Sequence, residues 1–194
     1  MLRAYKPLRG AKTHKDLGVW VGDSLKPFAH FFNANKSATS TLYAIKRALA
    51  VSDEDCFLKA FGTFVRPHFE YAIRAWRPWA QQGYNLIEMV QRRATKFIGD
   101  QDALPYEISL NSINLYPLSY RQLRGDLLQA LRIVRGLDDV LRYEDFFHLA
   151  TTTNLRRHPF KLRVQQGRLN VRKYFFSKRV VEQWNKMPET IVMA

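Results

Sequence analysis

Apolar residues recur at helical spacing along most of this chain, and this periodicity is the feature that most constrains its fold. A repeat of three to four residues places the apolar side chains of a segment on one face of an α-helix. We therefore predict a mainly α fold. The segments with this period are 37–49, 52–66, 69–76, 86–98, 119–134, 143–150 and 171–187.

The buried faces and ends of these helices follow from the same pattern. We predict that Pro67 kinks or ends the second helix, that Pro78 and Gly83 close the third, and that Gly136 stops the fifth. The last helix should end at Pro188. The residues predicted to face the core include Ala38, Leu42, Ile45, Phe57, Phe61, Phe64, Val65, Ile87, Val90, Ala94, Leu123, Leu127, Leu131, Val134, Phe176, Val180 and Trp184.

Two segments lack the helical period. Apolar Leu17, Val19 and Val21 alternate with their neighbours, and a turn-forming Gly-Asp-Ser follows at 22–24, so we predict a short strand or hairpin there. Residues 155–164 alternate weakly and favour an extended segment. The predicted fold is therefore mainly α, with one hairpin near the start.

Positive charge is concentrated in the two end quarters of the sequence. Residues 1–50 contain nine Lys or Arg against two acids, and residues 151–194 contain ten against two, within a total of +14. Residues 51–150 are nearly balanced. Segregated positive charge favours a polyanionic partner, above all nucleic acid, because neutralising phosphates releases counterions. The alternative is a basic surface that only keeps the protein soluble.

The basic residues of the C-terminal quarter are interleaved with aromatic ones. Cations can contact phosphates while exposed aromatic rings stack on bases, but Phe160, Phe175 and Phe176 could equally belong to a core. A smaller basic cluster ends the predicted helix at 86–98. The candidate nucleic-acid-binding residues are Arg92, Arg93, Lys96, Arg156, Arg157, Lys161, Arg163, Arg168, Arg172, Lys173, Lys178 and Arg179.

The sequence contains no motif that predicts catalysis. It has no glycine-rich phosphate loop, and its five histidines are not paired at zinc-ligand spacing with Cys56, the single cysteine. The acidic pairs at 138–139 and 144–145 could attract metal ions, but both also suit helix capping and solvated turns. We predict no catalytic, cofactor-binding or metal-binding residue. Without an apolar leader or an 18-residue apolar run, we expect a nuclear or cytoplasmic protein that is neither secreted nor membrane-bound.

Five ordered motifs resemble the C-terminal part of the reverse transcriptases of non-LTR (LINE-type) retrotransposons. Each motif alone is weak, but together they cover about residues 15–188. None of them contains the catalytic acid box of that family, which lies further upstream. The motifs are KDLGV at 15–19 followed by Leu25 and His30, FVRPHFEY at 64–71 with AWRP at 75–78, VQRRATK at 90–96, YRQLRGDL at 120–127, and VRKYFFSKRVV at 171–181 with Trp184 and Asn185.

The resemblance implies three parts and a parent activity. Residues 1–30 would be the palm edge with the primer-grip hairpin at Leu17, Gly18 and Val19, residues 31–100 a thumb-like bundle, and residues 101–194 a basic post-thumb region. Arg157 departs from the family, which has a small residue there. The parent enzyme is an RNA-directed DNA polymerase that uses Mg²⁺. We expect this chain, without the Tyr-x-Asp-Asp box, to be inactive alone.

The partners implied are RNA and DNA, as a template–primer duplex, together with the palm and fingers of the parent polymerase. A thumb holds such a duplex through its backbone and A-form shape. Two alternatives remain. One is a helical protein–protein interaction module with no nucleic-acid role, and the other is a retroelement remnant that folds poorly and has no function. Salt-dependent duplex binding would separate the first from the nucleic-acid hypothesis.

Overall fold

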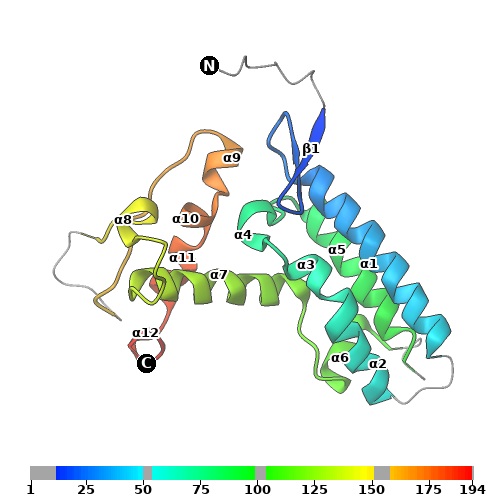
Figure 1. Cartoon of the computed structure of the whole chain (residues 1–194). Coiled ribbons are helices and arrows are strands. Elements are labelled where there is room, and N and C mark those ends of the chain that lie inside the picture. The colour runs from blue at the N-terminus through cyan, green and yellow to red at the C-terminus, as the bar shows by residue number, and fades with distance from the viewer. Residues whose placement is uncertain (1–11, 50–53, 99–103, 151–157, 194) are drawn as a thin grey trace.

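The computed structural model describes residues 12–49, 54–98, 104–150 and 158–193 (Figure 1). They form a mainly helical fold with a two-stranded antiparallel hairpin near the N-terminus, which confirms the predicted class. The elements are β1 (Thr13–Asp16), β2 (Val19–Gly22), α1 (Phe28–Ala48), α2 (Glu54–Ala60), the π-helical turn η1 (Phe61–Val65), α3 (Pro67–Glu70), α4 (Ile73–Trp76), α5 (Gln81–Thr95), α6 (Tyr106–Ser112), α7 (Leu118–Val134), α8 (Tyr143–Phe146), α9 (Asn170–Lys173), α10 (Phe176–Arg179), α11 (Val181–Lys186) and α12 (Glu189–Val192).

The hairpin is present, but its turn lies at residues 17–18 and not at the predicted position, 22–24. Strand β1 pairs with β2 from Thr13 opposite Gly22 to Asp16 opposite Val19. The turn consists of Leu17, at φ 42°, and Gly18, at φ 83°. Two positive φ angles in a two-residue loop match the twist of the flanking strands. Leu17 and Gly18 are therefore turn residues and not strand residues.

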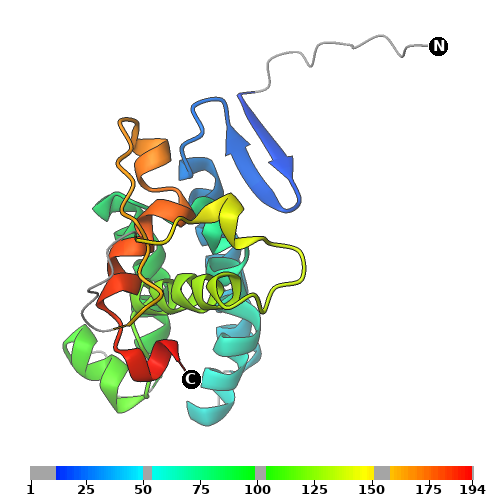
Figure 2. The ribbon, with the colours of Figure 1, turned by 90° about the vertical axis from the view of Figure 1, so that its left-hand side faces the viewer.

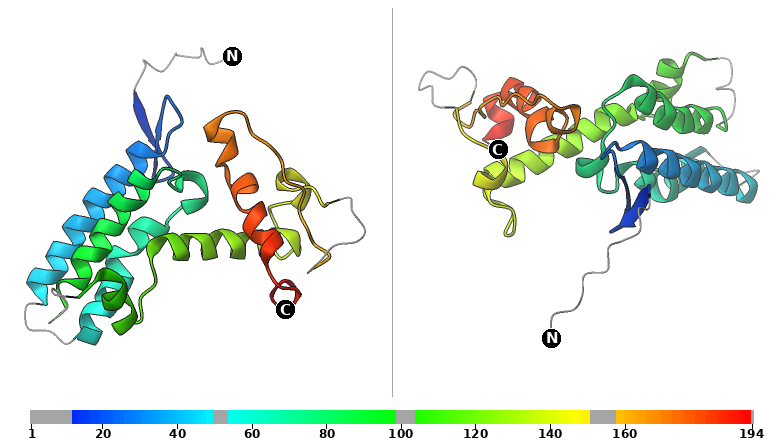
Figure 3. Two further views of the ribbon diagram at one scale, coloured as in Figure 1. Left: turned by 180° about the vertical axis from the view of Figure 1, so that it is seen from behind. Right: turned by 90° about the horizontal axis from the view of Figure 1, so that it is seen from above.

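Helix α1 is longer than predicted and lies beside α5. It begins at Phe28, nine positions before the predicted start at Ser37, because Phe31 and Ala34 extend the buried face that continues through Ala38. The two helices run side by side in the same direction (Figure 3). Their facing sides form the centre of a core that also includes Phe61, Val65, Phe69, Trp76, Ile87 and Val90.

A π-helical turn carries the chain from α2 into α3. The Arg66 N–H donates to the carbonyl of Phe61, five residues back, at 3.0 Å. Pro67 follows as the first residue of α3, where its missing N–H does no harm. The predicted interruption at Pro67 is therefore a change of helix type. The wider turn leaves Phe64 59% exposed, so its predicted burial is wrong.

Gly83 is also placed differently from the prediction, because it lies within α5 and not before it. A Cβ at this position would stand 2.8 Å from Cβ of Pro78 and 3.2 Å from the ring of Phe31. Glycine is thus required by the close approach of the neighbouring segments. Further along α5, Glu88 accepts a hydrogen bond from the N–H of Leu118 at 3.1 Å and caps the start of α7.

Helix α7 joins two hydrophobic cores and crosses the middle of the molecule (Figure 1). Leu118, at its start, belongs to the first core, and Ala130 and Ile133, near its end, belong to the second. The face between them is polar and carries Gln122 and Asp126, both buried. The predicted face of Leu123, Leu127, Leu131 and Val134 is only half-buried. Gly136, at φ 64°, follows the helix as predicted.

The second core is built from short helices and extended segments. The predicted helix at 143–150 ends at Phe146, and the predicted helix at 171–187 is divided into α9, α10 and α11. Phe175, at φ −62° and ψ 148°, interrupts the latter with extended backbone. Pro188 does end α11, but α12 follows it directly. The buried side chains include Phe147, Leu162, Phe176, Val180 and Trp184.

The second core is also held by polar contacts to its extended segments. The indole N–H of Trp184 donates to the carbonyl of Phe160 at 2.8 Å. Asn185 exchanges two hydrogen bonds with the backbone of Leu162, and Leu162 forms an isolated bridge with Leu149. This bridge is the only paired part, among the described residues, of the segment predicted to be extended at 155–164. Figure 2 shows the C-terminal helices stacked above one another beside α7. Within the described ranges, no helix combines the length and apolarity that crossing a membrane requires.

Candidate nucleic-acid interface

An open groove lies where the beginnings of α1 and α5 face α9. Its volume is about 730 Å³. Phe28 and Phe32 come from α1, Gln82 and Gly83 from α5, and Asn170 from α9. The hairpin and α9 lie at this same end of the molecule (Figures 1 and 2). The groove therefore brings together segments from both basic quarters of the sequence.

Aromatic rings form one wall of the groove. Phe28 stacks on Phe32 with ring centroids 6.0 Å apart and packs edge-on against Phe31 at 5.2 Å. Phe31 is buried, whereas Phe28 and Phe32 are 60% and 51% exposed. Exposed aromatic rings that line a groove are candidates for contact with a ligand. This wall thus offers a flat apolar surface to a ligand.

The opposite wall is also fixed by an aromatic contact. Trp79 stacks on Tyr174 with centroids 5.5 Å apart and planes 11° from parallel. The ammonium of Lys173 lies 5.4 Å from the centre of the Tyr174 ring. Tyr174 follows α9 directly, so this stack joins α9 to the segment before α5. The two segments are 95 positions apart in sequence, and the contact keeps them at a set separation.

One cation lines the groove and others lie next to it in the chain. Lys26 lines it on the α1 side, and the exposed Arg168, Arg172 and Lys173 flank the lining residues 169–171. No acidic side chain lines it among the described residues. Cations with no acid among the lining residues favour the binding of phosphate.

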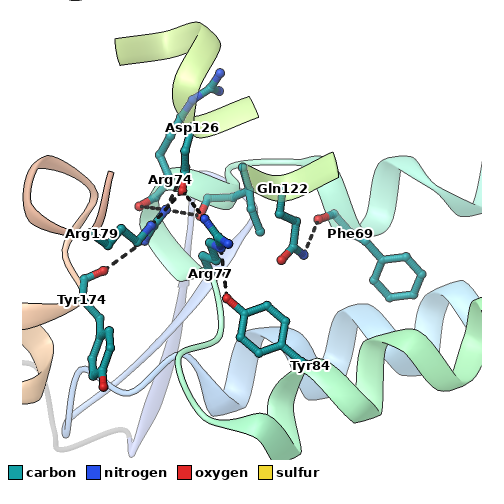
Figure 4. A network of polar contacts seen from close by, with 9 residues as sticks. Phe69, Arg74, Arg77, Tyr84, Gln122, Asp126, Tyr174 and Arg179 are labelled. Carbon is teal, nitrogen blue, oxygen red and sulfur yellow. Dashed lines mark hydrogen bonds and ion pairs between the residues drawn. The ribbon is translucent and has the colours of Figure 1, made fainter. Parts of the chain in front are cut away.

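A buried carboxylate holds the α9 side of the groove in place (Figure 4). Asp126, with no exposed surface, accepts hydrogen bonds from Arg77 at 2.7 Å and from two nitrogens of Arg179 at 2.9 and 3.0 Å. Arg179 also donates to the carbonyls of Tyr174, Ile73 and Arg74. The ion pair therefore joins α4, α7 and α10 at one point.

Arg179 consequently differs from the other predicted phosphate-binding residues. Its guanidinium is almost buried, and its three nitrogens donate to Asp126 and to three carbonyls. A side chain with this set of partners cannot turn to a phosphate without breaking the junction. We therefore remove Arg179 from the candidate interface.

The remaining predicted cations fall into separate groups. Arg168, Arg172 and Lys173 lie at the groove, and Lys178 lies nearby, where it donates to the carbonyl of Gln166. Lys161 and Arg163 flank Leu162 in the second core region. Arg156 and Arg157 lie outside the described residues.

Arg92, Arg93 and Lys96 lie at the opposite end of α5 from the groove. Helix α5 has 15 residues, so it separates its two ends by about 22 Å. All three side chains are exposed, and the guanidinium of Arg92 lies 4.7 Å from the centre of the Tyr106 ring. Lys46 and Arg47, at the end of α1, are exposed beside this cluster. Among the described residues, basic side chains thus lie at both ends of the α1–α5 pair.

The residues predicted as primer-grip-like form the tip of the hairpin. The hydroxyl of Tyr71 donates to the carbonyl of Leu17 at 2.6 Å and lies close to Gly18. Val19 is half-buried and packs against the first core. The tip is therefore fixed to the segment between α3 and α4.

Below the hairpin is an open pocket of about 400 Å³ that His30 and His68 line. The Trp20 N–H donates to Nδ1 of His30 at 3.2 Å, so the neutral ring carries its proton on Nε2. Burial, with a smaller contribution from the nearby Lys15 charge, lowers the pKa of His30 to about 4. Burial likewise lowers the pKa of His68. Both rings therefore favour the neutral form.

In the described part of the chain, no group of three or more His, Cys, Asp or Glu side chains could hold a metal ion. Asp138 of the first acidic pair accepts hydrogen bonds from the N–H groups of Val140 and Leu141. Glu144 and Asp145 occupy the first turn of α8. Both acidic pairs therefore have the turn and helix-start positions that capping requires.

Sequence reasoning missed Asp126 and the pair of Phe28 and Phe32. The sequence does contain a signal for Asp126, because this acid lies one helical turn from Gln122 and from Ala130 and so shares their face of the helix. The two phenylalanines were missed because the predicted helix began at Ser37. Comparison with protein-family models, with curated proteins and with solved structures finds no match to this chain.

Proposed function

We propose that this chain is a nucleic-acid-binding module that holds a phosphate backbone at the groove between α1, α5 and α9. The observation that carries the proposal is a groove that Lys26 lines on one side, with the exposed Arg168, Arg172 and Lys173 flanking the lining residues 169–171 and no acid among the described residues that line it. Such an arrangement favours a polyanion whatever its sequence, and whether it is single-stranded or double-stranded.

The proposal includes a thumb-like role of the kind that the resemblance to LINE-type reverse transcriptases implies. A pair of long parallel helices with a hairpin at one end supplies a rigid support for basic side chains. The hairpin tip, fixed by Tyr71, lies at the same end as the basic groove. A template–primer duplex is accordingly the nucleic acid that we would test first, and the proposal is for binding alone.

The salt dependence of duplex binding tests this function. About five phosphate contacts would make the slope of log affinity against log salt about −3.5 to −4.5. Replacing Arg168, Arg172 and Lys173 with alanine should reduce the steepness of that slope by about two to three units without changing sequence preference. The matched control replaces Arg124, Arg132 and Arg142, which are exposed elsewhere and remove the same charge. Equal losses in the two variants, or binding that is flat in salt, would overturn the proposal.

The basic side chains at the end of α5 away from the groove provide a length-dependent test. Replacing Arg92, Arg93 and Lys96 with alanine should weaken binding of a duplex long enough to follow α5 from end to end. The same replacements should not change the affinity for a duplex that is too short to reach both ends of α5. A loss that is independent of length would mean that these residues act only through net charge.

Docking of a protein has one observation in its favour. An apolar groove of about 250 Å³ runs between α7 and α12, lined by Leu127, Leu128 and Ile191, with Arg124 at its edge. The charge complementarity favours an acidic amphipathic helix as its occupant. If duplex binding fails the salt test, this groove is the surface that the interaction hypothesis would use.

A further inference from the structure

We propose that the groove at the start of α1 stacks an unpaired nucleobase, so that the module prefers single-stranded or frayed nucleic acid to a blunt duplex. This inference rests on the proposed function and adds a ligand class to the same surface. The rings, the amide side chains and the dimensions of the groove each suit a base.

The stacking surface is the face of the Phe28–Phe32 pair. Phe28 and Phe32 are more than half exposed, and both line the groove. Phe31 packs edge-on against Phe28 from the core and keeps its ring from folding inward. A base offers a flat π face of matching size, and stacking on an aromatic side chain is tolerant of base identity.

The groove also carries polar groups suited to a base edge. The amide side chains of Gln82 and Asn170 line it from opposite sides, and each offers both donors and acceptors. Their placement beside an otherwise apolar lining is typical of small planar ligands, which need few hydrogen bonds and much contact area.

A base that remains paired does not suit this mode of binding. Phe31 and Gly83 line the groove, and Gly83 lies so close to its neighbours that a Cβ there would stand 2.8 Å from Cβ of Pro78. Bases in a duplex are enclosed by their neighbours and by the backbone, so only an unstacked base could insert its face. The volume of about 730 Å³ lies within the range of small-ligand sites.

Charge decides between a nucleotide and other flat apolar ligands. Lys26 lines the groove, and the exposed Arg172 and Lys173 follow directly after the lining residues Asn170 and Val171. A base bound in the groove brings its own phosphates near these cations. An uncharged aromatic ligand would gain no ion pair from them.

The experiment compares an unstructured oligothymidylate with a blunt duplex of the same length, using binding titrations of the whole chain. Replacing Phe28 and Phe32 with alanine should weaken oligothymidylate binding by about fivefold or more, the lower limit for stacking of one base, and leave duplex binding and both salt slopes unchanged. Phe64→Ala is the matched control, because Phe64 is a helical phenylalanine with 59% exposure on another surface. It should change neither affinity.

A second variant separates stacking from simple apolar contact. Replacing Phe28 and Phe32 with leucine keeps apolar bulk and removes the π faces, so it should lose as much oligothymidylate affinity as the alanine variant. Retained affinity in the leucine variant would overturn the inference. Equally weak binding by Phe64→Ala would overturn it too, as would wild-type protein that binds the duplex as tightly as the single strand.

The inference and the proposed function fail differently. If the phenylalanine variants bind normally while the triple variant at Arg168, Arg172 and Lys173 loses its salt dependence, the backbone-binding function stands and the base site falls. If wild type binds neither nucleic acid, both are overturned. A melting curve for each variant establishes that the altered chains are folded before they are compared.

Discussion

The two hydrophobic cores of this molecule are of similar composition but are built differently. The first is carried by long helices, with 21 residues in α1 and 15 in α5. Beyond α7, the second is carried by helices of four to six residues and by extended segments around Phe147 and Leu162. Short helices are unstable in isolation and depend on side-chain packing. The second region should therefore respond more sharply to the loss of a single buried side chain.

The surface at which the two regions meet is different again, because it is polar. Asp126 lies between Arg77 and Arg179 at the middle of α7, with apolar cores at either end of that helix. A buried ion pair contributes less to stability than its Coulomb energy suggests, but its geometry is demanding. The junction thus sets how the regions are oriented, while the cores supply the free energy.

The largest expected effect comes from removing the indole at the centre of the second core. Trp184→Ala deletes a fully buried side chain and should lower the free energy of unfolding by about 5 kcal/mol. Amide hydrogen exchange should show lost protection in residues 158–193 and retained protection in α1 and α5. Leu42→Ala, at a fully buried site in α1, is the comparison and should affect mainly the first core. Uniform loss of protection in both variants would contradict the division into two regions.

The next effect concerns the junction. Asp126→Ala leaves Arg77 and Arg179 largely buried without a counter-charge and should cost about 3 kcal/mol, measured by denaturant titration. Asp55→Asn is the control, because Asp55 pairs with Lys59 on the exposed surface of α2 and should cost less than about 1 kcal/mol. If the two changes cost the same, the junction does not orient the regions.

Two glycine-to-alanine replacements should change the stability by smaller amounts and in opposite directions, because one glycine is closely packed and the other is not. Gly83→Ala places a methyl group against Pro78 and Phe31 and should destabilise the protein by about 1–2 kcal/mol. Gly125→Ala, within α7, meets no atom within 4 Å and should stabilise it by about 0.5–1 kcal/mol through helix propensity. Thermal melting of both variants measures the difference. Two shifts in the same direction would show that α5 is not closely packed at Gly83.

The last effect is a pH dependence confined to the first region. The pKa of His30 is lowered from its ordinary value of 6.5 to about 4, so the unfolded chain takes up a proton between these values and the folded chain does not. Stability should therefore fall as the pH falls from about 6.5 toward 4. His30→Asn keeps an acceptor for the Trp20 N–H and should flatten this slope by up to about one proton.

The first region was the more predictable from sequence. Long apolar stripes such as Ile87, Val90 and Ala94 lie on the buried face, as expected. A long periodic segment repeats its apolar pattern over several helical turns, and this repetition identifies the buried face. The second region was not, since a run such as 171–187 keeps helical spacing while Phe175 adopts extended backbone. Spacing alone does not report an interruption that tertiary packing imposes.

The candidate site was predicted only in part. Arg168, Arg172 and Lys173 are exposed beside the groove, as expected, because charged side chains are rarely buried unless they are paired. The same reasoning misplaced Arg179, whose partner Asp126 is 53 positions away and meets it only in the folded chain. Phe28 and Phe32 could not be assigned to a groove before the position of α9 was known.

The π-helical turn at Phe61–Val65 has a consequence for how this chain can change in length. The residues Phe57, Phe61, Val65, Phe69 and Ile73 are buried at steps of four, a spacing that would drift by about 40° per step around a regular α-helix. The wider turn absorbs part of that drift. Loss of one residue here would tighten η1 into an ordinary helical turn, with Pro67 meeting the carbonyl four residues before it. Deletion of one residue at η1 should therefore be tolerated better when Pro67 is replaced as well, whereas replacement of Pro67 alone leaves η1 unchanged.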